Sequence, residues 1–90
     1  MKYFEWNEQK NKQLIKEREI SFEMVVICIK NGDILDKIKH PNQKKYPGQH
    51  IYIIKIDEYV YAVPFVEDDK KIFLKTIIPS RKLVKQYLNK

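Results

Sequence analysis

Cysteine and glycine are scarce in this sequence, and each shortage excludes a class of site. Cys28 is the only cysteine, so an internal disulfide and a cysteine-based zinc site are excluded. The two glycines, Gly32 and Gly48, are too few for a phosphate-cradling loop, and we expect no nucleotide or other cofactor. His40 and His50 are not at metal-ligand spacing, so we predict no metal site.

Long hydrophobic runs are also missing. No apolar stretch approaches the roughly 18 residues that a membrane helix needs, and the first residues lack the apolar segment of a signal peptide. We therefore expect a cytoplasmic protein with no membrane partner. The composition of the 90 residues, 43% hydrophobic and 33% charged, is typical of one folded domain, here residues 1–90.

Positive charge is plentiful and unevenly placed. The formal net charge is +6, and the chain from Lys70 onward carries bases but no acid. A second acid-free stretch, residues 37–56, contains lysines and both histidines. This asymmetry favours an anionic partner such as nucleic acid. The alternative is that an A/T-rich genome has enriched lysine without regard to function.

Hydrophobic periodicity predicts an α+β fold with a short N-terminal strand, two helices, an antiparallel four-strand meander and a C-terminal helix. Asn7, Ser21 and Ser80 stand where helix N-caps belong. Pro64 cannot donate to a β-ladder, which indicates an edge position or a bulge. The helices are expected at about 7–18 and after 21 and 80, and the strands at about 4–6, 34–38, 51–56, 59–66 and 72–78.

Arg81 and Lys82 are the first candidate site residues. They follow Ser80 at the start of the last helix, where two cations beside free backbone N–H groups are typical of an anion site. Period two places Lys75 on the strand face of Phe73 and Ile77, from which it can hold a phosphate. The alternative is that these cations are only solvated surface charges.

The polar segment 41–49 and the two histidines that flank it supply the other candidates. His40 and His50 suit proton transfer near neutral pH, although a histidine beside a proline turn is more often a plain loop residue. Tyr46 lies next to Lys44 and Lys45, so it can stack on a base or merely cover the edge of the core.

Three stretches of the chain resemble the BrnT family of bacterial toxins: FEWNEQK at 4–10, ISFE at 20–23 and IIPSRK at 77–82. The sequence departs from the family pattern at Asn7, at Arg18-Glu19 and at Pro79-Ser80, and its middle matches poorly. The resemblance implies a RelE-like fold and a metal-independent ribonuclease activity. It also implies neutralisation by a BrnA-like antitoxin, a ribbon-helix-helix DNA-binding protein, in an oligomeric toxin–antitoxin complex.

The sequence therefore leads to the hypothesis of an endoribonuclease toxin of a type II toxin–antitoxin system. In this hypothesis Arg81, with Lys82 and Lys75, binds the scissile phosphate while a ribose 2′-OH attacks it, and His40 or Tyr46 transfers the proton. The RNA is expected to lie along Lys44, Lys45 and Lys85. The rival hypothesis is a non-catalytic basic module that docks nucleic acid or an acidic protein.

Overall fold

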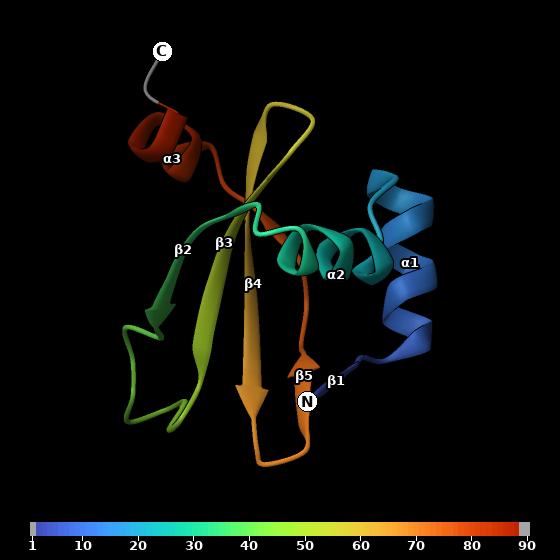
Figure 1. Cartoon of the computed structure of the whole chain (residues 1–90). Helices are drawn as coiled ribbons and strands as arrows, with labels where there is room; N and C mark the ends of the chain where they lie inside the picture. The colour runs from blue at the N-terminus through green and yellow to red at the C-terminus, as the bar shows by residue number, and fades with distance from the viewer. Residues whose placement is uncertain (1, 89–90) are drawn as a thin grey trace.

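A computed structural model describes residues 2–88 and shows a mixed α+β fold, which confirms the predicted fold class (Figure 1). Two helices follow a short first strand, and a C-terminal helix follows the sheet. The last helix begins as a single α-helical turn, α3, and continues as a π-helical turn, η1. The elements are β1 (Tyr3–Glu5), α1 (Glu8–Arg18), α2 (Phe22–Lys30), β2 (Ile34–Lys39), β3 (His50–Ile56), β4 (Tyr59–Glu67), β5 (Lys71–Leu74), β6 (Ile78–Pro79), α3 (Arg81–Leu83) and η1 (Val84–Leu88).

Side-chain caps set the starts of α1 and α2 where the sequence predicts them. Asn7 Oδ1 accepts a hydrogen bond from the backbone N–H of Lys10 at 3.0 Å. Ser21 Oγ accepts one from the N–H of Met24 at 3.2 Å. Each cap satisfies a backbone donor that has no partner within its own helix. None of the helices within residues 2–88 has both the length and the apolarity needed to cross a bilayer.

The sheet has the strand order β1-β5-β4-β3-β2, with β6 paired to β4. The pairs β2–β3, β3–β4 and β4–β5 are antiparallel, which confirms the predicted meander. The first strand, β1, pairs in parallel with β5, with Phe4 opposite Ile72. The sequence did not predict this pairing, since it joins segments almost at opposite ends of the chain.

The predicted strand over residues 72–78 is wrong as one element, because the chain leaves the ladder between β5 and β6. Leu74 pairs with Phe65, and Ile78 pairs with Ala62, so the break lies opposite Pro64. Pro64 accepts a hydrogen bond from the N–H of Lys75 at 2.8 Å but has no N–H to return. The proline in this central strand is therefore accommodated by an interruption in its neighbour. The prediction of an edge position or a bulge at Pro64 is wrong, because β4 pairs on both sides and keeps its register with β3 across Pro64.

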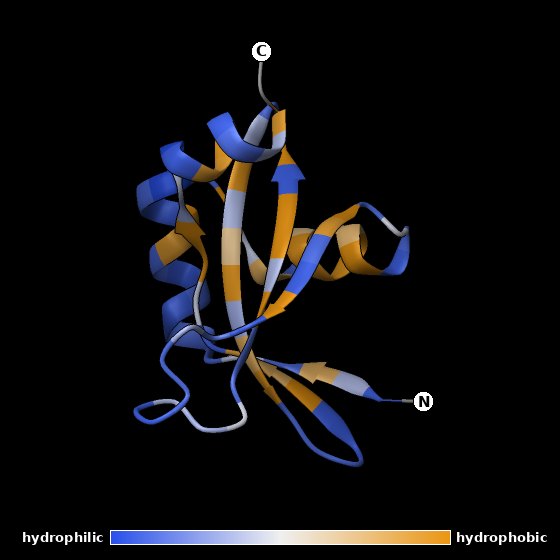
Figure 2. Ribbon diagram, turned by 90° about the vertical axis from the view of Figure 1, so that its left-hand side faces the viewer, coloured by the Kyte–Doolittle hydropathy of each residue, from blue (hydrophilic) through white to orange (hydrophobic). Residues whose placement is uncertain are grey.

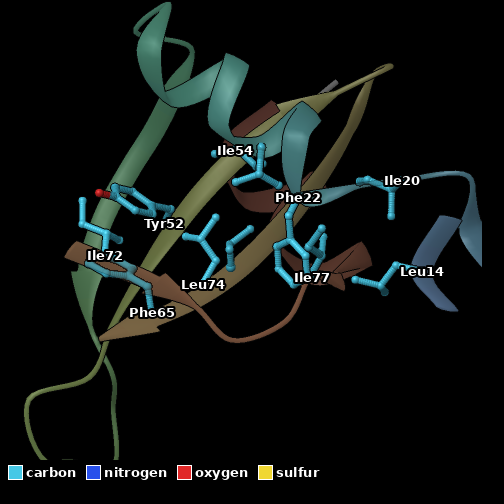
Figure 3. Close-up of a cluster of buried hydrophobic side chains, with 11 residues drawn as sticks. Leu14, Ile20, Phe22, Tyr52, Ile54, Phe65, Ile72, Leu74 and Ile77 are labelled. Carbon is cyan, nitrogen blue, oxygen red and sulfur yellow. The ribbon is translucent and has the colours of Figure 1, made fainter. Parts of the chain in front are cut away.

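The main hydrophobic core lies between one face of the sheet and the two N-terminal helices (Figure 3). Phe22 and Val25 of α2 are fully buried against Ile54, Phe65 and Leu74 of the strands. By contrast α1 is thinly anchored: Leu14 is buried, whereas its neighbour Ile15 is 47% exposed. The hydrophilic colouring of α1 in Figure 2 reflects this.

The opposite face of the sheet carries a smaller apolar layer beneath the C-terminal helix. Ile53 and Val60 are buried but lie outside the main core, since alternation along a strand turns them to the other face. Both α3 and η1 contact β4. The Tyr87 hydroxyl donates a hydrogen bond to Asp36 Oδ2 of β2 at 2.7 Å, which fastens the helix across this face.

Candidate functional site

The residues predicted to bind RNA form two groups at opposite ends of the sheet (Figure 1). His40, Lys44, Lys45 and Tyr46 belong to the loop that joins β2 to β3. That loop ends at the level of Phe65 in β4, because His50 pairs with Phe65. The helix with Arg81, Lys82 and Lys85 follows Pro79, which pairs with Tyr61. Four residues of strand separate the two levels by about 13 Å, so the groups do not meet at one phosphate.

Ser80 caps the C-terminal helix, as the sequence predicts. Its Oγ accepts a hydrogen bond from the N–H of Leu83 at 3.2 Å, and its carbonyl accepts one from Val84 at 3.1 Å. Arg81 and Lys82 are exposed beside this cap. The cap satisfies the N–H of Leu83, and Arg81 and Lys82 add exposed positive charge beside it.

Lys75 lies elsewhere, in a groove next to α1. The prediction that it shares a face with Phe73 and Ile77 is wrong for Ile77, which is buried in the main core. The reason is the break after β5, where the chain no longer alternates with period two. Lys75 instead lines the groove with Phe73 and with Lys10 of α1, and Arg81 is not among its lining residues.

The β2–β3 loop does bring its predicted residues together. The rings of His40 and Tyr46 pack together with centroids 4.4 Å apart and their planes tilted by 41°. The Lys45 ammonium lies 5.5 Å from the centre of the Tyr46 ring, within cation–π range. This arrangement fixes both rings at a basic and exposed end of the molecule.

The hydrogen bonding of His40 does not favour the role in proton transfer that the sequence suggested. Its Nδ1 accepts a hydrogen bond from the backbone N–H of Asn42 at 3.0 Å. The proton of the neutral ring is then on Nε2, which can donate to a phosphate oxygen but has no lone pair to accept a proton. His40 in this geometry is a hydrogen-bond donor and not a general base.

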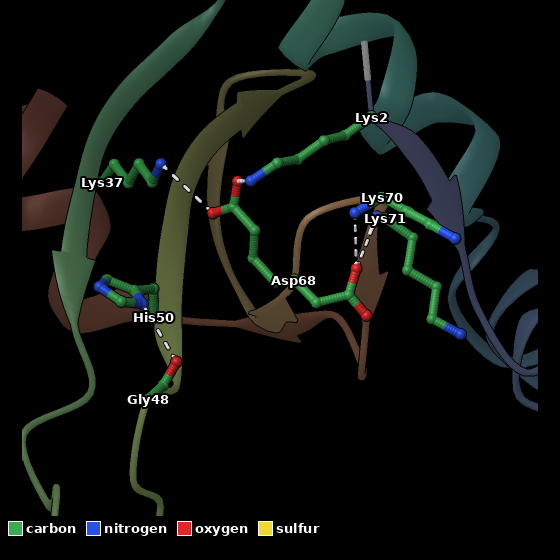
Figure 4. Close-up of polar contacts among 8 residues, drawn as sticks. Lys2, Lys37, Gly48, His50, Asp68, Lys70 and Lys71 are labelled. Atoms are coloured by element: carbon green, nitrogen blue, oxygen red, sulfur yellow. Dashed lines mark hydrogen bonds and ion pairs between the residues drawn. The ribbon is translucent and has the colours of Figure 1, made fainter.

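His50 has the opposite arrangement. Its Nδ1 lies 3.3 Å from the carbonyl oxygen of Gly48, and because a carbonyl can only accept, Nδ1 carries the proton (Figure 4). Nε2 of the neutral ring therefore keeps a free lone pair, which is the state of a general base. The sequence did not distinguish the two histidines. The close spacing of Gly48 and His50 was the only local signal.

Lys37 and Glu67 lie on the same face of the sheet as His50, the face that carries the main core (Figure 4). Glu67 at the end of β4 accepts a hydrogen bond from the Lys2 ammonium, and the Lys37 ammonium lies 4.0 Å from its other oxygen. We call Lys2, Lys37, His50 and Glu67 the His50 cluster. Sequence reasoning missed Lys37 and Glu67, because Glu67 was read as part of a turn and Lys37 as one of many lysines.

Aromatic rings form the floor of the His50 cluster. Tyr52 and Phe65 are buried and stack with centroids 4.1 Å apart. The Lys37 ammonium lies 5.8 Å from the Tyr52 ring and 5.6 Å from the Phe65 ring. The His50 ring also packs against Phe65, at 5.8 Å. These contacts hold the charged groups over a rigid apolar base.

The electrostatics of the cluster keep Glu67 ionised. The hydrogen bond from Lys2 lowers the pKa of the Glu67 carboxyl, and the charges of Lys2, Lys37 and His50 lower it further. Burial, and then the charge of Glu67, raise the pKa of the Tyr52 hydroxyl. Tyr52 therefore stays neutral, while Glu67 balances part of the positive charge.

Replacing Glu67 with Gln should reduce the acid sensitivity of the fold. A carboxyl whose pKa is lowered on folding contributes stability above its ordinary pKa, near 4.3, and loses it as pH falls through the folded value. We expect the wild-type protein to lose about 0.2–1 kcal/mol from this pair on acidification from pH 6 to pH 3, in the range of surface ion pairs. Urea midpoints at both pH values measure it. If the wild type and Glu67→Gln lose equal stability between pH 6 and pH 3, the ion pair of Glu67 does not stabilise the fold.

Within residues 2–88, no three His, Cys, Asp or Glu side chains are grouped so that they could hold a metal ion. The chemistry that the site offers comes from an imidazole, ammonium groups and one carboxylate. No family model, curated protein sequence or solved structure matches this chain.

Proposed function

We propose that this protein is a metal-independent endoribonuclease that acts at the His50 cluster. The observation that carries the proposal is the orientation of His50: its Nδ1 donates to the Gly48 carbonyl, which leaves the Nε2 lone pair free. The His50 ring and the Lys37 ammonium both pack on the Phe65 ring, at 5.8 Å and 5.6 Å from its centre. A base and a cation held over the same aromatic ring suit the attack of a ribose 2′-OH on its own phosphate. The net charge of +6 favours a polyanionic substrate.

The proposed reaction needs no group beyond the chain and water. His50 Nε2 takes the proton of the 2′-OH, and the 2′-oxygen forms a bond to phosphorus. The bond from phosphorus to the 5′-oxygen breaks, and the leaving oxygen takes a proton from water. The products are a 2′,3′-cyclic phosphate and a 5′-hydroxyl, and the His50 imidazolium then returns its proton to solvent.

The lysines of β2 are the proposed phosphate ligands at the reacting centre. Lys39 pairs directly with His50 across the β2–β3 ladder, and Lys37 pairs with Tyr52. Lys37 is bound only loosely by Glu67, at 4.0 Å, so a phosphate can compete for it. Ammonium groups at this position stabilise the charge that develops on the phosphorane oxygens.

The two groups predicted from the sequence become binding sites for the flanking RNA. Lys44, Lys45 and the packed rings of His40 and Tyr46 extend the basic surface beyond the end of β2. Arg81, with Lys82 and Lys85, lies at the other end of the sheet and is proposed to hold a phosphate several nucleotides away. This division replaces the idea that Arg81 and His40 act on one phosphate.

A toxin role and a RelE-like fold remain part of the proposal. The resemblance of residues 4–10, 20–23 and 77–82 to the BrnT family supports both, together with the order of two helices, a mainly antiparallel sheet and a basic C-terminal helix. The proposed partner is a BrnA-like antitoxin of the ribbon-helix-helix class in an oligomeric complex. Growth arrest on expression, relieved by the gene beside it, is the corresponding cellular test.

Replacing His50 with Ala should lower cleavage about 100-fold or more, the usual contribution of a general base. The measurement is the initial rate on a mixed RNA substrate in EDTA, with products sized on a gel. Lys37→Ala should also slow cleavage, whereas His40→Ala should mainly weaken binding. Lys12→Ala is the matched control, since Lys12 is an exposed cation on α1 away from the cluster.

The cleavage rates of these variants show which histidine acts as the base. Wild-type activity in His50→Ala would remove His50 from the reaction, and a larger loss in His40→Ala would return the role to the loop. RNA that stays intact with the wild-type protein across pH and salt would overturn the ribonuclease.

One observation favours a second function, a non-catalytic module that docks nucleic acid or an acidic protein. The separation of Arg81 from both histidines leaves the predicted phosphate site without an acid or base. A pure phosphate binder loses affinity steeply with salt and leaves RNA uncut, which distinguishes it from the enzyme.

A further inference from the structure

The groove beside α1 is a second surface suited to nucleic acid. The sequence singled out only Lys75 among its lining residues, and the proposed reaction does not use it. Its volume is about 640 Å³, within the range of small-ligand sites. One wall is α1, and the other is the end of β5 with the irregular residues that follow it. Its lining residues are Asn7, Gln9, Lys10, Gln13, Phe73, Lys75 and Thr76.

The groove has positive charge that other side chains leave available. Lys10 is half-buried on the α1 wall, and Lys75 is exposed on the opposite wall. Among the described residues, neither takes part in an ion pair, and no carboxylate lines the groove. On the sheet side, Glu5 pairs with Phe73 across the ladder, and its carboxylate binds the Lys71 ammonium at 3.1 Å.

The remaining lining residues match the chemistry of a base. The Phe73 ring is half-buried, so one part of it faces the groove and can stack on a base. Gln9 and Gln13 present amides from successive turns of α1, and an amide both donates and accepts, as a base edge requires. Among residues 2–88, the Gln13 side chain hydrogen-bonds only to Glu17 one turn further along the helix, at 3.2 Å.

We propose that this groove binds one or two nucleotides of a single strand of RNA. The base stacks on Phe73, the glutamines read its edge, and Lys10 and Lys75 neutralise the adjoining phosphates. An acidic peptide would use the lysines but would leave the ring and the amides unused. The inference extends the proposed ribonuclease, because it gives the substrate a contact surface separate from the His50 cluster.

Binding of a labelled 2′-O-methyl RNA octamer, followed by fluorescence anisotropy, tests the groove without cleavage. Phe73→Leu keeps apolar volume but removes the stacking ring, and we expect affinity to fall about tenfold. In Lys10→Ala/Lys75→Ala the slope of log affinity against log salt should become shallower by about 1.4, since each phosphate contact of a single strand contributes about 0.7. Lys12→Ala/Lys16→Ala is the control, with two exposed lysines removed from the same helix.

Each outcome decides the proposal. If both groove variants bind the octamer with the affinity and the salt slope of the wild type, the groove does not bind RNA. The proposed ribonuclease would still stand if the wild-type protein cleaves unmodified RNA. An octamer that does not bind the wild-type protein would also overturn it. Oligoglutamate that binds as tightly as the octamer, with no effect of Phe73→Leu, would show an acidic-peptide site in place of the base site. Loss of cleavage in His50→Ala tests the proposed reaction and not RNA binding in the groove.

Discussion

Replacing Phe22 with Ala is expected to destabilise the fold by about 3–5 kcal/mol, the range for removing a buried aromatic ring. Phe22 is fully buried at the start of α2, and its ring stacks on Trp6 with centroids 5.7 Å apart. Truncation leaves a cavity that the surrounding helix and strands cannot close, since α2 is held in place by its cap and by the core. The total free energy of unfolding of a domain of this size is only about 5–15 kcal/mol.

Thermal unfolding followed by circular dichroism measures the effect, with an expected decrease in Tm of at least about 12 °C. Tyr3→Ala is the matched control, because Tyr3 is also aromatic but 53% exposed. A Tm for Phe22→Ala within a few degrees of the wild type would show that the packing between α2 and the sheet is not as described.

Replacing Asn11 with Ala should cost about 2–4 kcal/mol, a large effect for a polar residue. Asn11 is 3% exposed and joins the two N-terminal helices. Its Oδ1 accepts a hydrogen bond from the N–H of Phe22 at 2.8 Å, and its Nδ2 donates to Glu23 Oε1 at 2.9 Å. Alanine leaves the Phe22 N–H buried without an acceptor, and the penalty for such an orphaned donor dominates the loss.

Urea unfolding of Asn11→Ala against Gln13→Ala tests this, since both variants remove an amide from α1 but Gln13 is exposed. Asn11→Asp adds a second reading. Aspartate keeps an acceptor for Phe22 but brings a carboxylate against Glu23, whose pKa is lowered in the wild type chiefly by the Asn11 bond. We expect Asn11→Asp to be destabilised at neutral pH and to recover part of that loss on acidification. An Asn11→Ala variant as stable as the wild type would contradict the stabilising role of the Asn11 hydrogen bonds to Phe22 and Glu23.

The elements of the fold were predictable where local chemistry determines them. The caps at Asn7 and Ser21 and the apolar spacing of α2 depend on residues within a few positions of one another, and the structure confirms them. The break after β5 was not predictable, because its cause, Pro64, lies in a neighbouring strand. The burial of Asn11 was missed for a similar reason, since its partners are on α2.

The candidate site was predictable in composition but not in arrangement. The sequence indicated which lysines and histidines are present, but not that the rings of His40 and Tyr46 pack together in the β2–β3 loop. The choice between His40 and His50 depends on which backbone group each Nδ1 faces, and that is set by the path of the loop. Glu67 reaches the cluster only because β4 extends to it.

The parallel pairing of β1 with β5 imposes an order on synthesis. A ribosome releases β1 and both N-terminal helices long before β5 emerges, and β5 is the strand that β1 pairs with. Until then Phe22 and its neighbours have no Leu74 to pack on, and β1 has no partner. The nascent chain therefore exposes an unfinished core and an open strand through most of its translation, the state in which chaperones bind and chains aggregate.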